Sequence, residues 1–112
     1  MNWTKEFPAA ITVCDREGTV LAMNDQSCKM FAKDGGAALI GQSLFPCHPG
    51  ESGEKLQRLL QQEAPNVYTI EKQGRKKLIY QAPWYEQGQY QGYVELSFEL
   101  PAQVPHFVRD QG

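Results

Sequence analysis

The last third of the chain has the clearest hydrophobic pattern. Between residues 76 and 100, two apolar and aromatic runs flank the polar break at residues 86–89, which is the sequence form of a β-hairpin. In the second run, the even positions from Val94 to Leu100 are apolar, whereas the odd ones hold Tyr93 and three polar residues. A period of two predicts one aliphatic and one mainly polar sheet face. With a further run over residues 67–71, we expect three consecutive antiparallel strands.

The chain before these strands predicts two short strands, two short helical segments and one longer helix. In order, they are expected over residues 9–14, 19–23, 25–33, 37–45 and 51–62. The turn Asp15–Gly18 joins the two strands, because an aspartate can bond the backbone and a glycine can take the left-handed conformation. The longer helix is the clearest, since Leu56, Leu59 and Leu60 form one apolar stripe.

Composition narrows the class of protein. The 112 residues predict one domain with a single core. A net charge of −2 gives no electrostatic footprint for nucleic acid, and no apolar run approaches the ~20 residues of a membrane span. The N-terminus lacks a signal-peptide pattern. Cys14, Cys28 and Cys47 form no CxxC pair, which favours free thiols in the reducing cytoplasm.

Candidate catalytic chemistry is sparse. The chain has no phosphate loop, no HExxH and no GxSxG motif, and its two histidines are His48 and His106. We therefore expect a protein that is not an enzyme. Many aromatic side chains lie in the predicted sheet, where they either pack in the core and the sheet or line a pocket or dimer face. Glu95 falls on a strand predicted to be central, where a buried carboxylate would need a partner.

Several of these segments together resemble a PAS domain. They are the Asp15-x-x-Gly18 turn, Asn24 closing the second strand, the turn at residues 40–44, the Cys47-His48-Pro49 step and the hairpin at residues 86–92. The resemblance covers about residues 8–100, leaving a short cap at 1–7 and a tail at 101–112. It implies an α+β fold: a five-stranded antiparallel sheet of order 2-1-5-4-3 with short helices across one face.

The resemblance also implies a function. PAS domains serve in signal transduction as sensors, often holding a small molecule between sheet and helices, or as dimerisation modules. We expect a stand-alone sensory module of this kind, either a complete protein or a domain excised from a longer one. The expected pocket residues are Val13, Ala22, Phe31, Ile40, Leu44, His48, Leu56, Leu60, Tyr80 and Leu96.

Two alternatives stay open beside the small-molecule sensor. The first is a ligand-free interaction module that forms a homodimer through the sheet face that no helix covers, with the segment 3–7 covering part of it. The second is a haem-binding gas or redox sensor, because a histidine on the corresponding helix binds iron in one branch of the family. His48 is the candidate ligand, although its place before the helix favours a local role at the pocket rim. No other metal site is expected.

Overall fold

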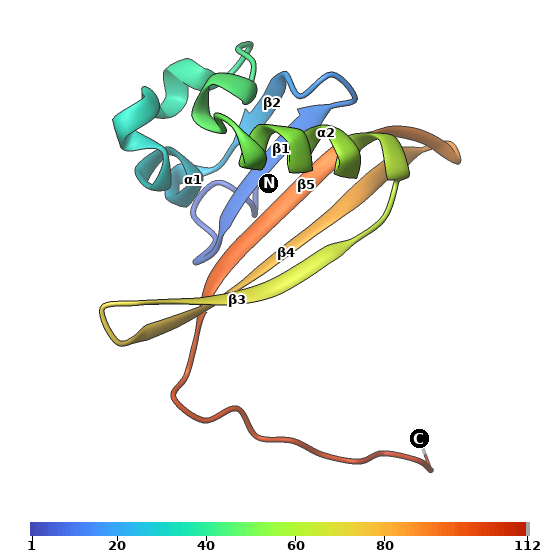
Figure 1. Cartoon of the computed structure of the whole chain (residues 1–112). Helices are drawn as coiled ribbons and strands as arrows, with labels where there is room; N and C mark the ends of the chain where they lie inside the picture. Colours follow the sequence, from blue (N-terminus) through green and yellow to red (C-terminus); the bar gives the residue numbers. More distant parts are fainter. Residues whose placement is uncertain (112) are drawn as a thin grey trace.

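One antiparallel sheet and one layer of helices make up the computed structural model, which describes residues 1–111 (Figure 1). The last residue of the expected tail, Gly112, lies outside the described residues. Along the chain the elements are β1 (Ala10–Asp15), β2 (Val20–Met23), α1 (Asp25–Met30), three 3₁₀ turns (Ala32–Asp34, Gly36–Leu39 and Phe45–Cys47), α2 (Glu51–Gln62), β3 (Asn66–Lys72), β4 (Arg75–Glu86) and β5 (Gln89–Leu100).

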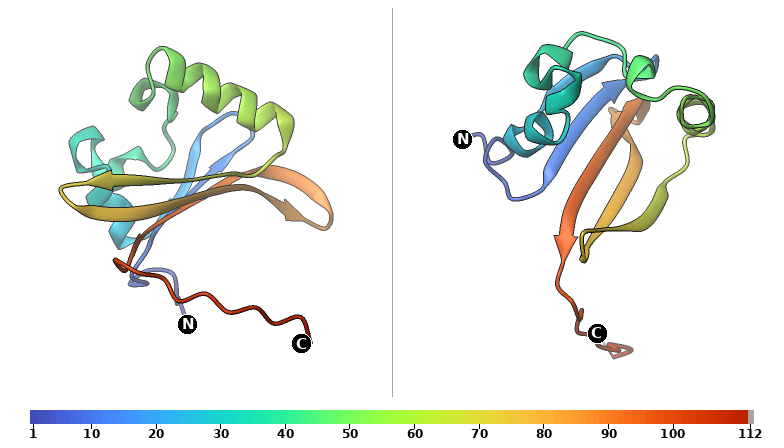
Figure 2. Two further views of the ribbon diagram at one scale, coloured as in Figure 1. Left: turned by 60° about the horizontal axis from the view of Figure 1, so that its bottom comes forward. Right: turned by 60° about the vertical axis from the view of Figure 1, so that its left-hand side comes forward.

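The sheet has the strand order β2-β1-β5-β4-β3, and all neighbours are antiparallel. The expected fold class is therefore confirmed. Within residues 1–111, the helices lie on one face of this sheet, and no helix covers the other face (Figure 2). The leucine stripe gave the bounds of α2 correctly. The first helix is shorter than expected, because α1 ends at Met30 and 3₁₀ turns follow.

The strand register decides which side of β5 faces the helices. Cys14 on β1 pairs with Tyr93 on β5, and both belong to the core formed with Val20 of β2 and Leu60 of α2. From Tyr93 onward, the odd positions of β5 therefore point toward the helices, and the even positions, including Leu96, point to the open face. The predicted alternation along β5 was correct, but alternation alone does not indicate which face of the sheet the helices cover.

Asn24 connects the strands to the helical layer. Its side-chain Oδ1 accepts hydrogen bonds from the backbone N–H of Ser27, at 3.0 Å, and of Ile11, at 2.8 Å. The first of these bonds caps α1. Its Nδ2 donates to the carbonyl oxygens of Ala9, at 2.7 Å, and Thr4, at 2.9 Å. One buried amide thus fixes the start of α1 against β1 and the N-terminal segment.

Two glycines allow backbone approaches that a side chain would prevent. Gly18 has φ of +84° in the turn after β1, and a Cβ there would lie 2.9 Å from the ring of Phe45. Gly92 has φ of +153°, and its Cβ would overlap the carbonyl oxygen of Cys14. Gly92 therefore permits the close contact between β1 and β5 that sets the register around Tyr93.

The ends of the chain lie outside these two layers. Residues 101–111 contain no helix or strand, and they run away from the sheet beyond β5 (Figure 1). The N-terminal segment holds an edge-to-face pair of rings, Trp3 and Phe7, whose centroids are 5.4 Å apart. Within residues 1–111, no helix combines the length and apolar character that crossing a membrane requires.

Candidate functional site

A small cavity of about 80 Å³ lies between the sheet and the helices. Its lining residues come from β1, β4, β5, α2 and the segments around the 3₁₀ turns. They are Thr12, Cys14, Phe31, Leu44, His48, Leu56, Gln81, Tyr93 and Glu95. The sheet thus supplies a mainly polar floor, and the helical layer supplies a mainly apolar roof.

The floor is held by a chain of side-chain hydrogen bonds across three strands. Asn66 on β3 donates from Nδ2 to Oε1 of Gln81 on β4, at 2.8 Å. Gln81 in turn donates from Nε2 to Oε2 of Glu95 on β5, at 2.7 Å. On the β1 side, the hydroxyls of Thr12 and Ser27 are 2.5 Å apart. The carboxyl group of Glu95 therefore has the partner that its central position required, and the partner is a neutral amide.

Tyr93 places an unpartnered hydroxyl in this region. Its OH group is buried and has no hydrogen-bond partner among residues 1–111. Desolvation is the main cause that raises the pKa of this phenol, and the neighbouring Cys14 and Tyr85 raise it further. An unpaired buried hydroxyl costs free energy, so a molecule in the cavity that completes its bonding would recover that cost.

Cys14 is not a nucleophile at neutral pH. Burial raises the pKa of its thiol to about 11, and the charges of Asp15 and Glu95 add to the effect, whereas a backbone hydrogen bond from Tyr93 opposes it. The thiolate is the reactive form of cysteine. Cys14 therefore contributes a small, neutral surface to the cavity.

His48 closes the roof in a defined tautomer. Its Nδ1 lies 3.0 Å from the carbonyl oxygen of Leu44. A carbonyl oxygen accepts only, so Nδ1 must carry the proton, and in the neutral ring Nε2 is then an acceptor. The hydrogen bond orients the ring one turn before α2.

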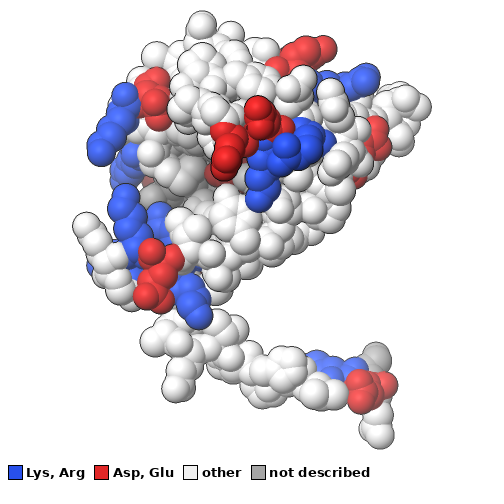
Figure 3. All heavy atoms as spheres, viewed as in Figure 1, with Lys and Arg blue, Asp and Glu red and all other residues white. Residues whose placement is uncertain are grey.

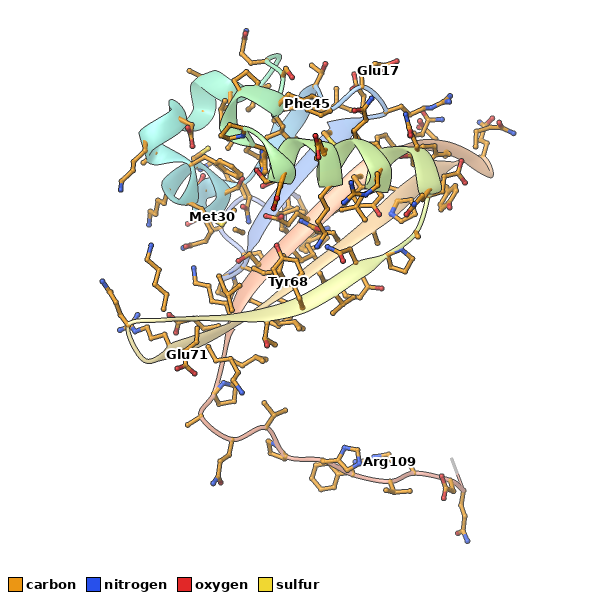
Figure 4. All side chains as sticks on the ribbon, in the orientation of Figure 1. Glu17, Met30, Phe45, Tyr68, Glu71 and Arg109 are labelled. Carbon is orange, nitrogen blue, oxygen red and sulfur yellow. The ribbon has the colours of Figure 1, made fainter. Side chains whose placement is uncertain are left out.

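Aromatic side chains tie α2 to the strands beside the cavity. The hydroxyl of Tyr90 on β5 donates to the carbonyl oxygen of Leu60, at 2.6 Å, and burial is the main cause that raises its pKa to about 12. Tyr68 projects from β3 toward α2 (Figure 4), and the Nζ of Lys55 lies 5.5 Å from the centroid of its ring. A further aromatic side chain joins two strands of the sheet: the indole N–H of Trp84 on β4 donates to the carbonyl oxygen of Cys14 on β1, at 3.0 Å.

The structure brings together four of the ten residues expected in a pocket: Phe31, Leu44, His48 and Leu56. Leu60 packs in the adjoining core. The others do not reach this cavity: Val13, Ala22, Tyr80 and Leu96 lie on the open side of the sheet, and Ile40 is exposed. The expectation selected apolar residues, and the register turns the apolar side of the strands away from the helices.

Sequence reasoning missed the five floor residues: Thr12, Cys14, Gln81, Tyr93 and Glu95. A signal was present, because Tyr93 and Glu95 alternate with the aliphatic residues of β5. Polar residues on a central strand indicated a polar site, but the prediction placed the apolar residues of that strand in the pocket.

Metal and haem binding find little support in this geometry. No group of three or more potential metal ligands occurs within residues 1–111. A volume of about 80 Å³ is far below the several hundred Å³ typical of sites for larger organic ligands. His48 has a free Nε2, but the cavity around it has no room for a porphyrin, so haem does not fit the residues present.

The chain is similar to one protein family and to several solved structures. Residues 4–103 match the family model described as the PAS fold, whereas no curated protein sequence matches the chain. The PAS domain of BvgS from Bordetella pertussis superposes with a TM-score of 0.65 at 17% identity, covering 89% of this chain and 82% of that one.

Two further solved structures have the same fold. The Aer2 receptor from Vibrio cholerae, described as a dual PAS-heme oxygen sensor, gives a TM-score of 0.64 at 14% identity, covering 83% of this chain and 95% of that one. A sensory box sensor histidine kinase from the same organism gives 0.64 at 13% identity, with coverages of 88% and 86%. With the family match over residues 4–103 and the observed strand order, the chain belongs to the PAS-fold family.

Proposed function

We propose that the chain is a non-catalytic sensory module that binds a small molecule in the cavity between the sheet and the helices. The observation that carries this proposal is the polar floor of the cavity, where the hydroxyl of Tyr93 is buried without a partner. The family membership agrees with a sensory role, since related folds occur in a receptor and in a sensor histidine kinase. The three unpaired cysteines suit a reducing location such as the cytoplasm.

The position of the cavity supplies a route for a signal. A ligand would contact Tyr93 and Glu95 on β5 below, and Leu56 on α2 above. Binding can shift a conformational equilibrium only through contacts that differ between the two states. Because the ligand would contact both layers, its binding would shift the equilibrium between positions of α2 that lie closer to the sheet and positions that lie further from it.

The experiment is native mass spectrometry of the purified protein, with a variant that fills the cavity. Leu56→Trp adds volume to the roof, whereas the control Val67→Trp adds the same ring at an exposed position on β3. We expect wild type and Val67→Trp to carry a small bound mass, or to acquire one from a metabolite mixture, and Leu56→Trp to lose it. Equal binding by all three proteins, or no binding by wild type, would refute this function.

A second candidate role is homodimerisation through the open face of the sheet. Across β4 and β5, this face pairs Leu78 with Phe98, and Tyr80 with Leu96, and Tyr80 is 42% exposed. A contiguous apolar surface of this kind marks interaction sites. The N-terminal segment shares a groove with the β1–β2 end of the face, leaving the β4–β5 part free for a second copy.

Sedimentation tests this second role. We expect a dimer at roughly tens of micromolar protein, a concentration that detects micromolar affinity. Leu96→Glu, which puts a charge on the face, should give a monomer, whereas Leu21→Glu, at an exposed position on the edge strand β2, should leave the dimer intact. A wild-type protein that is entirely monomeric would contradict the proposal.

A further inference from the structure

We infer that the cavity accepts a small organic cation with several N–H donors, of the alkylammonium or guanidinium class. This inference rests on the proposed function, because it names the ligand class of the same cavity. It follows from four properties of the lining: its charge, its balance of donors and acceptors, its volume and its aromatic rings.

The charge of the lining is negative. Glu95 is the one acidic residue of the cavity wall, and no lysine or arginine is part of that wall. Within residues 1–111, the two ion pairs join Lys5 to Asp25 and Arg75 to Glu99, so neither neutralises Glu95. Its Oε2 accepts from Gln81, which leaves Oε1 for a ligand. A cation is therefore the ligand charge that the cavity stabilises.

Hydrogen-bond acceptors predominate among the other polar groups of the lining. Both ends of the Gln81 amide are already used, one by Asn66 and one by Glu95. The neutral ring of His48 offers Nε2 as an acceptor, since Nδ1 donates to Leu44. The hydroxyl of Tyr93 has no partner and can accept as well as donate. Acceptors therefore outnumber free donors, and a fitting ligand must supply hydrogen atoms.

The lysines and arginines visible in Figure 3 lie on the outer surface, interspersed with aspartates and glutamates, and none of them belongs to the cavity wall. The cavity wall also includes the rings of Phe31 and Tyr93, and aromatic faces attract organic cations. These observations favour a cation over a neutral amide or an anion.

The volume sets the size of the ligand. At about 80 Å³, the cavity takes roughly five to eight heavy atoms, because holding one water molecule takes roughly 10–15 Å³ of cavity volume. Methylguanidinium and propylammonium match this size. Larger cations, such as an intact basic peptide, do not.

Calorimetric titration tests the inference with matched probes at constant ionic strength. Methylguanidinium and propylammonium are compared with propionate and propanol, which share the size but differ in charge. We expect at least one cation to bind and propionate not to bind. Glu95→Gln should weaken cation binding at least tenfold. The control is Glu99→Gln, which removes a carboxylate from the same face of β5 outside the cavity and should leave binding unchanged.

A second variant guards against a folding defect in Glu95→Gln. Tyr93→Phe removes only the hydroxyl, so it should keep the fold and weaken cation binding several-fold. Cation binding that Glu95→Gln and Tyr93→Phe leave unchanged would overturn the inference, as would tighter binding of propionate. A neutral or anionic molecule found in the cavity would refute the ligand class but leave the sensor function standing. If no probe and no co-purified molecule binds, both fail.

Discussion

Asn24→Ala is expected to be among the most destabilising single changes in this domain. Truncation removes the N-cap of α1 and takes a hydrogen-bond partner from four backbone groups: the N–H of Ile11 and Ser27, and the carbonyls of Ala9 and Thr4. Of these, the Thr4 carbonyl keeps the N–H of Phe7 as a partner. Asn24 is itself only 5% exposed, so water has poor access to several of the groups that lose their partner.

The expected loss of unfolding free energy is the sum over the broken hydrogen bonds. Loss of an asparagine N-cap costs about 1 kcal/mol. A buried donor or acceptor left without a partner costs about 1–3 kcal/mol, and the Ile11 amide and the Ala9 carbonyl are in this position. The sum is about 3–7 kcal/mol of unfolding free energy, a large share of the ~5–15 kcal/mol that stabilises a typical domain.

Urea denaturation followed by circular dichroism measures this loss. With an m-value of about 1.5 kcal/mol/M, the midpoint should fall by about 2–5 M. Asn24→Asp keeps the acceptor bonds but loses both donor bonds, so it should have an intermediate stability. Asn2→Ala, at an exposed position, should lie within about 0.5 kcal/mol of wild type. A loss below about 1 kcal/mol for Asn24→Ala would refute the reasoning.

Three further changes test other parts of the structure. Iodoacetamide should modify half-buried Cys28 well before Cys14 at pH 8.5, as read by peptide mass spectrometry, since the pKa of the Cys14 thiol is raised to about 11. Because that folded-state pKa lies above the ordinary thiol value of 9.0, the contribution of Cys14 to the unfolding free energy is complete below pH 9, and about 2–3 kcal/mol is lost as the pH rises through 11. Equal stability at pH 8.5 and 11 would contradict this. Gly92→Ala should lower the unfolding free energy by more than about 3 kcal/mol, because the added Cβ would push β1 away from β5. Gly88→Ala should cost only about 1 kcal/mol, since the space around Gly88 is open. Similar urea midpoints for the two variants would exclude the close contact between Gly92 and β1. Leu96→Ala should cost only about 1–2 kcal/mol in the monomer because Leu96 lies on the open face, and a loss near 4 kcal/mol would show that the face is covered.

The sequence was sufficient for the arrangement of the elements. The leucine stripe predicted α2 because helical spacing leaves one consistent face. The strand order was predicted only through the resemblance to PAS domains, which the motifs around Asp15, Asn24 and the last hairpin carry. Turn chemistry also predicted the role of Gly18. The short helices were less predictable, since few residues are involved and 3₁₀ turns replace the ends of the expected helices.

The composition of the site was less predictable for a physical reason. Alternation divides a strand into two faces, but the choice of the covered face depends on contacts between distant strands, such as the pairing of Cys14 with Tyr93. The apolar side of β5 was therefore assigned to the helices. The actual cavity wall combines Glu95 and Gln81. Their mutual hydrogen bond offsets the cost of burying both polar groups, and it can form only when β4 and β5 are in register.

The indole of Trp84 gives the protein an internal optical reporter. It donates its N–H to the carbonyl of Cys14, the residue whose side chain lines the cavity. Trp3, the other tryptophan, is 60% exposed, so Trp3→Phe would leave a single emitter attached to the floor of the site. Displacement of β1 by a bound molecule would alter this hydrogen bond, and the emission wavelength and quantum yield of Trp84 would follow the occupancy of the cavity without any added dye.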